Sequence, residues 1–277
     1  GNQALVSLTD GQRNVAAGFT AGQLITTGEN NVAIGYAAAN GFDTESHNLA
    51  IGTDALGGSV AGGEYNVAIG NYALDALTSA DSVTAVGYEA GSAYTTGDSG
   101  AGRSVFMGYQ AGKAITTAHD QVIIGSGAAA TGVGTNRGLI AVGRNAGNDK
   151  TSGDNCVFIG LDSGANVTSG ADSIFIGRSA GDGHDTEGNN LSIGTHALGG
   201  PIAGGEYNVG IGNYSLFALT SADYNTVIGY EAGAAITTGG SNTLIGYQAG
   251  DSMTTTGSTV AILLQKVDKI LQLVMEL

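Results

Sequence analysis

The chain has 277 residues and a formal net charge of −15, with 49 glycines, one proline, one cysteine and no tryptophan. This acidic balance disfavours nucleic acid and anionic membrane surfaces as partners, because phosphate groups would be repelled. No apolar run reaches the roughly 18 residues that are needed to span a bilayer, so the sequence predicts no membrane insertion.

From about residue 12 to residue 257 the chain is built from a short repeat, whose most regular feature is an aliphatic residue followed by an anchor glycine. The anchors are Gly18, Gly35, Gly52, Gly70, Gly87, Gly108, Gly125, Gly143, Gly160, Gly177, Gly194, Gly212, Gly229 and Gly246. Nine of the 13 spacings are 17 residues, three are 18 and one is 21. A repeat of this length is typical of a solenoid, in which each unit forms one rung and contacts only its neighbours. The glycines do not follow the Gly-X-Y period of collagen.

The residues before each anchor alternate in the manner of a strand. The positions one and three before the glycine are mostly aliphatic, as in Val32 and Ile34, and predict a strand with one face on a core. The position between them points to the opposite face and is also largely apolar, as in Ala33, Phe106 and Val227. A strand that is buried on both faces fits a solenoid that packs against another copy.

The residues after each anchor predict turns. The third residue is Ala in 12 units and Ser in two, which indicates a crowded position, and the next residue is often a glycine that suits a positive φ. A second aliphatic site follows seven residues after the anchor, as in Ile25, Ile115, Ile236 and Met253. Each unit is therefore expected to hold two short strands and two turns.

A longer duplication lies on top of the repeat. Residues 51–97 match residues 193–239 at an offset of 142, which spans eight rungs. Within this match the 21-residue spacing inserts extra residues near Gly97 to Arg103, where the later copy is four residues shorter. We expect the insertion to bulge from the shaft, either as a recognition loop or as a neutral addition.

The hydrophobic period changes in the last residues, 258–277. Apolar side chains recur there at spacings of three and four, at Val260, Leu263, Val267, Ile270, Val274 and Leu277. These are a and d positions of a coiled coil, so residues 1–257 are predicted to form the solenoid shaft and residues 258–277 a coiled-coil helix. The alternative is one amphipathic helix that folds back on the solenoid.

The repeats resemble two known groups of fibrous proteins. Asn30 to Tyr36 and Asn242 to Gly250 resemble the head repeats of YadA-like trimeric adhesins, and still more the N-T-A-I-G-Y-x-A-G repeats of phage tail fibres. The resemblance covers residues 12–257 and implies a left-handed parallel β-roll, three chains side by side and a coiled-coil stalk. The period of 17–18 residues is longer than in bacterial adhesin heads, which favours the phage group.

Candidate chemical sites are few. The four histidines, His47, His119, His184 and His196, occupy unrelated repeat positions and form no metal-spaced pair. Acidic residues gather in turns, at Asp43 and Glu45, at Asp149 and Asp154, and at Asp182, Asp185 and Glu187. Such turns can bind calcium or supply a glycosidase pair, but solvated turn residues are the simpler interpretation.

Other recurring residues have structural explanations. The tyrosines after the anchor can stack on sugars or form a ladder over the turns, and they are Tyr36, Tyr88, Tyr109, Tyr230 and Tyr247. Paired threonines such as 116–117 can bind ice or belong to turns. The run from Gly132 to Gly134 is expected to be a turn rather than a dinucleotide site. The lone Cys156 excludes an intrachain disulfide. The sequence therefore predicts no catalytic, metal or cofactor-binding residues, no cofactor and no enzyme.

The functional expectation is a structural fibre or adhesin segment, a phage tail fibre used in host-cell attachment. Its partners would be two further copies in a homotrimer, a glycan or protein receptor on the host surface, and other fibre or baseplate proteins. The chain would be located in the virion or at a cell surface. The alternatives are a bacterial trimeric surface adhesin, an extracellular structural filament, and a polysaccharide depolymerase, which would release reducing ends from capsule.

Overall fold

The computed structural model describes residues 1–58, 62–96, 102–200 and 204–262. Over these residues the chain is an all-β parallel β-solenoid of about 14 turns. It forms two compact units, residues 1–158 and 159–277. No helix is assigned in the described ranges.

Each strand has three residues and ends just before an anchor position. The first unit holds β1 (Val15–Ala17), β2 (Val32–Ile34), β3 (Leu49–Ile51), β4 (Val67–Ile69), β5 (Thr84–Val86), β6 (Val105–Met107), β7 (Val122–Ile124) and β8 (Ile140–Val142). The boundary falls within β9 (Val157–Ile159). The second unit holds β10 (Ile174–Ile176), β11 (Leu191–Ile193), β12 (Val209–Ile211), β13 (Thr226–Ile228), β14 (Thr243–Ile245) and β15 (Val260–Ile262).

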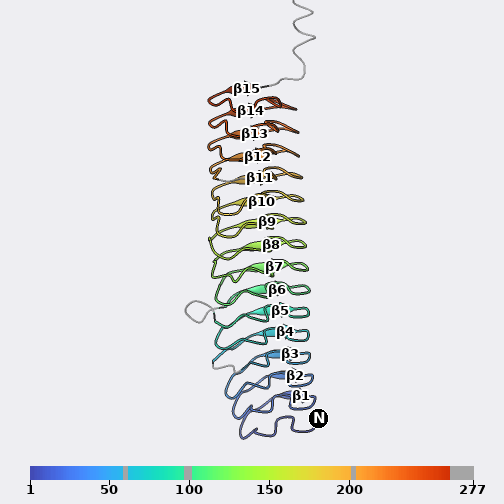
Figure 1. The fold of residues 1–277 in the computed structure, drawn as a ribbon. Helices are drawn as coiled ribbons and strands as arrows, with labels where there is room; N and C mark the ends of the chain where they lie inside the picture. The colour runs from blue at the N-terminus through green and yellow to red at the C-terminus, as the bar shows by residue number, and fades with distance from the viewer. Residues whose placement is uncertain (59–61, 97–101, 201–203, 263–277) are drawn as a thin grey trace, which may run out of the picture. The chain divides into compact units, whose positions relative to one another are not determined.

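Strands of successive rungs pair in parallel at matched repeat positions, as the constant period predicts. Val32 pairs with Leu49 and Ala33 with Ala50 in the first unit, and the same register continues to β8. In the second unit Val227 pairs with Leu244, both in the middle of their strands. Figure 1 shows the strands of each unit stacked in chain order.

The predicted apolar character of both strand faces is confirmed, but the predicted core face is wrong. The middle residue of each strand points into the coil, where Ala33 and Phe106 are buried. The two flanking residues point outward, and Ile34 and Met107 keep 39% and 41% of their surface exposed. The interior of so small a coil has room for one strand side chain per rung, so the two flanking aliphatic residues lie on the outer face.

Each rung has one strand rather than the two predicted. The chain after the anchor forms a tight turn in which non-glycine residues adopt positive φ, such as Ala37 at 51° and Ala39 at 50°. The second aliphatic site ends this turn, and in one rung the Ile25 N–H donates to the carbonyl of Gly22 at 3.2 Å. Ile25, like Ile115, is still fully buried, so the position belongs to the core although it is no strand.

The anchor must be glycine because the rungs approach each other there through backbone alone. Gly35 has a φ of 138°, and a Cβ added to it would lie 2.3 Å from the carbonyl oxygen of Gly52 in the next rung. Both the backbone conformation and the missing space exclude a side chain. The aliphatic-Gly motif thus marks the point of closest contact between rungs.

A column of asparagines, all buried except the half-buried Asn14, lies in each unit four residues before the anchors, and we call it the asparagine ladder. Its members are Asn14, Asn31, Asn48 and Asn66 in the first unit, and Asn190, Asn208, Asn225 and Asn242 in the second. The Oδ1 atom of Asn31 accepts the backbone N–H of Asn48 at 2.9 Å, and its Nδ2 donates to the carbonyl of Glu45 at 2.7 Å. Each side-chain amide therefore supplies hydrogen-bond partners that the backbone of the turns would otherwise lack.

The boundary predicted for the C-terminal helix is corrected at its first residues. Val260, assigned above to a heptad a position, lies in β15 and pairs with Thr243 of β14. Val260–Ile262 is another Val-Ala-Ile strand, and it lacks only the anchor glycine, since Leu263 follows it. The heptad positions from Leu263 to Leu277 lie outside the described residues.

Candidate functional site

The outward strand positions form an apolar surface on each unit, which we call the outer aliphatic face. It consists of the first and third residues of the strands, which lie in register from rung to rung. Its most exposed members inside the stacks are Ile34 and Met107 in the first unit and Ile159, Ile174, Ile228 and Ile245 in the second, at 36–41%. Soluble monomers rarely expose a continuous apolar surface, and such a surface marks an interaction site.

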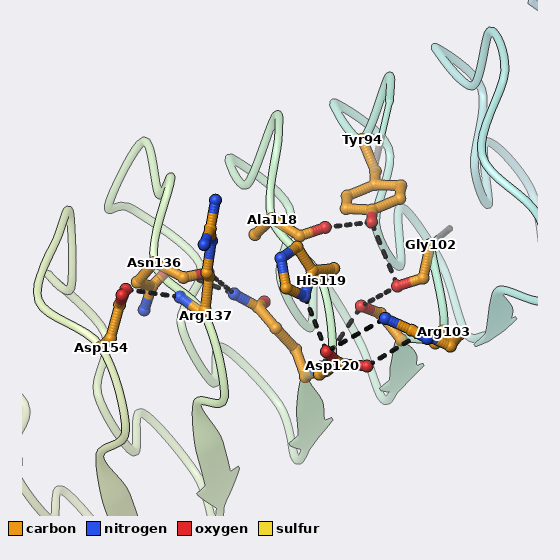
Figure 2. Close-up of polar contacts among 11 residues, drawn as sticks. Tyr94, Gly102, Arg103, Ala118, His119, Asp120, Asn136, Arg137 and Asp154 are labelled. Atoms are coloured by element: carbon orange, nitrogen blue, oxygen red, sulfur yellow. Dashed lines mark hydrogen bonds and ion pairs between the residues drawn. The ribbon is translucent and has the colours of Figure 1, made fainter. Parts of the chain in front are cut away.

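Tyr94 anchors the base of the predicted insertion, whose residues 97–101 lie outside the described ranges. Its side chain is fully buried, and its hydroxyl hydrogen-bonds to the carbonyl oxygens of Gly102, at 3.4 Å, and Ala118 (Figure 2). The duplicated rung has Ile236 at the same position. The exchange of Ile for Tyr at a core position was a readable signal that this rung is built differently.

Charged side chains line the turns next to this base (Figure 2). Arg103 Nε lies 3.0 Å from Asp120 Oδ1, and His119 Nδ1 lies 2.7 Å from Asp120 Oδ2. The hydrogen bond from His119, with the Arg103 charge beside it, holds the pKa of Asp120 below its ordinary value. In the next rung Asp154 accepts the backbone N–H of Arg137 at 2.8 Å. These contacts pair the charges with one another and connect rungs.

The acidic turn residues cap backbone. Glu45 accepts N–H groups of Asp43 at 2.7 Å and Gly62 at 2.9 Å, and Glu187 repeats the arrangement with Asp185 and Gly204 at 2.9 and 2.8 Å. Burial would raise the pKa of Glu187, but the backbone donors outweigh it and the pKa is lowered.

The remaining acids of this group also have protein partners. Asp154 takes the Arg137 N–H noted above, Asp43, Asp149 and Asp185 accept threonine hydroxyls, and Asp182 accepts the Asn166 amide at 3.2 Å. Within the described ranges, no cluster of three or more His, Cys, Asp or Glu residues is placed to hold a metal ion.

The histidines lie in separate environments. His47 stacks on Tyr65 with a centroid distance of 4.9 Å, and His196 stacks on Tyr214 at 5.5 Å. His184 is fully buried against Phe175, and neither ring nitrogen meets a hydrogen-bond partner in the described part of the chain. It stands seven residues after its anchor, the position that holds isoleucine in other rungs, so its burial could have been predicted.

The tyrosines that follow the anchors stack between rungs, as the ladder interpretation predicts. Tyr88 and Tyr109 stack at 5.5 Å, and so do Tyr230 and Tyr247. The first threonine of the pairs is also occupied between rungs, since the Thr95 hydroxyl donates to the carbonyl of Thr116 at 3.1 Å. Cys156 is buried at a position of the asparagine ladder.

Comparison with protein-family models, with curated proteins and with solved structures found no match to the chain. Among the residues that the structure describes, none belongs to a helix long and apolar enough to cross a membrane.

Proposed function

We propose that the chain is a shaft segment of a homotrimeric phage tail fibre that serves host attachment. The observation that carries this proposal is the outer aliphatic face, which repeats on rung after rung and stays partly exposed among the residues that the structure describes. Three copies in parallel would pack these faces together around a common axis. The left-handed sense of the coil and the trimeric state are parts of the proposal that come from the resemblance to fibre repeats.

The energy available from this face is large enough for obligate assembly. Full burial of an isoleucine side chain contributes about 1.5–3 kcal/mol. Side chains such as Ile228 and Ile245 are already about two-thirds covered, at 37% and 36% exposure. A partner would then add about 0.5–1 kcal/mol for each residue. Because each rung supplies such residues, the contributions add up along a whole unit and offset the cost of association.

The heptads from Leu263 to Leu277 add a second element to the proposal. Similar rungs make it easy for one chain to slip by a rung relative to its neighbours, since the side chains still match. A coiled coil allows only one height, because its a and d residues fit only at matched levels. We assign the last residues this register function, in a helix that is too short to be stable without the shaft.

The test is a pair of charges on the outer aliphatic face. Ile228→Asp with Ile245→Asp should lower the assembled fraction strongly, because two carboxylates per chain would be buried without partners. The matched control is Tyr224→Asp, a position 61% exposed near the turn, which should leave assembly unchanged. Light scattering measures the mass of all three proteins. If the double variant assembles as well as the unmodified chain, the face is not the interface.

A further inference from the structure

A groove opens on the first unit beside the tyrosine ladder. It has a volume of about 580 Å³ and is formed by turns that follow β4, β5, β6 and β7. It is lined by Tyr72, Asp75, Tyr88, Glu89, Ser92 and Lys113, together with alanines. Its size falls in the range of small-molecule sites, about 300–1,000 Å³.

The tyrosine ladder is interrupted beside the groove. Asn71 takes the position after the anchor Gly70, and the ring of Tyr72 stands one residue later. Tyr72 therefore meets Tyr88 edge to face, with an interplanar angle of 86° and a centroid distance of 6.0 Å. In the regular ladder above, Tyr88 and Tyr109 stack at 13°. Tyr72 and Tyr88 keep 38% and 41% of their surface exposed, and Tyr109 in the regular ladder keeps 55%.

Groups of both charges surround this ring surface. Lys113 Nζ lies 2.5 Å from Glu89 Oε2, and that carboxylate also accepts the Gln110 amide at 2.7 Å. These contacts hold Glu89 and Lys113 in place. Asp75 also lines the groove, and its partial burial, followed by the nearby Asp54, raises its pKa above the ordinary value. The groove thus presents fixed acceptors and a fixed donor next to aromatic faces.

The duplicated block carries the same rungs with different side chains at some of the groove positions. Tyr214, Tyr230 and Glu231 correspond to Tyr72, Tyr88 and Glu89 at an offset of 142. Phe217 stands at the position of Asp75, and its ring packs on Tyr214 at 5.9 Å and on His196 at 6.2 Å. Asp251 stands five residues after its anchor glycine, which is the repeat position that Lys113 holds in the first block. The backbone tolerates either arrangement, so the open groove is a property of its side chains.

We propose that this groove binds a neutral saccharide unit. The carboxylates of Asp75 and Glu89 would repel an anion, and the Lys113 ammonium would repel a cation. A neutral sugar has an apolar ring face for the tyrosines and hydroxyl groups that both donate and accept hydrogen bonds. This inference names the receptor chemistry of the proposed attachment function and rests on that function.

The experiment measures binding of the full-length chain to a printed array of neutral hexose and N-acetylhexosamine oligosaccharides, with sialylated and sulfated glycans on the same surface. Asp75→Phe installs the residue of the second block, so the rung keeps a side chain that it is known to accommodate. Tyr88→Ala removes ring surface inside the groove. Tyr224→Ala is the control, because it removes an exposed tyrosine that does not line the groove.

The expected result is binding to neutral glycans that falls at least tenfold in Asp75→Phe and Tyr88→Ala and is unchanged in Tyr224→Ala. Absence of binding to any neutral glycan, binding to the anionic set alone, or equal binding by Asp75→Phe would each overturn the proposal. Light scattering on the same samples separates the two proposals. An intact trimer without glycan binding refutes only the groove, whereas a glycan-binding monomer refutes only the trimeric fibre.

Discussion

Replacing Asn225 by leucine tests the asparagine ladder as the main polar support of the second unit. The Oδ1 atom of Asn225 accepts both the backbone N–H and the side-chain amide of Asn242, each at 3.0 Å. Leucine leaves this backbone N–H buried without an acceptor, since Asn242 is itself fully buried. An orphaned buried donor costs about 1–3 kcal/mol, and each lost hydrogen bond about 1 kcal/mol. We therefore expect the free energy of unfolding to fall by about 2–4 kcal/mol.

The matched variant is Asn225→Ser, because the chain itself places serine in the ladder. The hydroxyl of Ser173 accepts the backbone N–H of Asn190 at 3.3 Å, so serine at 225 should retain a weaker acceptor and cost about 1 kcal/mol. Urea denaturation followed by circular dichroism measures all three proteins. Equal stability of the leucine and serine variants would show that the amide acceptor contributes nothing, and the reasoning about the ladder would fail.

Three further outcomes are expected. Burial lowers the pKa of His184 from 6.5 to about 4, so between these pH values the unfolded chain binds more protons than the folded chain. The free energy of unfolding should therefore fall by about 3 kcal/mol as the pH drops from 6.5 to about 4. His184→Ile should remove this part of the pH dependence in thermal melts. Gly112→Ala should destabilise the fold by about 2–4 kcal/mol, since its Cβ would lie 2.3 Å from Phe106 at a φ of 61°. The same substitution should cost less when it is made in a Phe106→Ala background, which a double-mutant cycle in the same denaturation assay measures. Deleting residues 98–101 together with Tyr94→Ile copies the second block and should keep the assembled mass and melting temperature, whereas a collapse of either would place the insertion in the core.

The rung architecture could be predicted from sequence because it depends on backbone rules. The anchor positions need positive φ and no side chain, as Gly35 shows, and that requirement appears directly as a spaced glycine. Parallel register follows, since rungs of equal length place equal positions side by side. The small third residue after each anchor, such as Ala38, is buried because the rungs are also crowded there.

The orientation of the strand could not be predicted, because both of its faces are apolar. Ile34 and Ala33 are both hydrophobic, and only the width of the coil decides that the alanine lies inside. Where the inner residue is large, glycine elsewhere in the rung makes room, as Gly112 does for Phe106. The sequence repeat describes one position at a time, so it does not show that a glycine at one position compensates for a large residue at another.

The groove was missed for a related reason. Tyr72 and Tyr88 belong to the same repetitive pattern as the other tyrosines, and a shift of one residue changes stacking into an edge contact. A comparison of the duplicated blocks at Asp75 and Phe217 would have indicated the difference. Its meaning depends on which side chains meet between rungs, which requires the structure.

The mass of the assembled chain in solution tests the central claim most directly. If three outer aliphatic faces pack together, light scattering at micromolar concentration should give about three times the 27.3 kDa of one chain, without dissociation on dilution. A monodisperse species of 27.3 kDa would contradict the trimeric fibre, because it would show that the outer aliphatic face is stable in water without a partner.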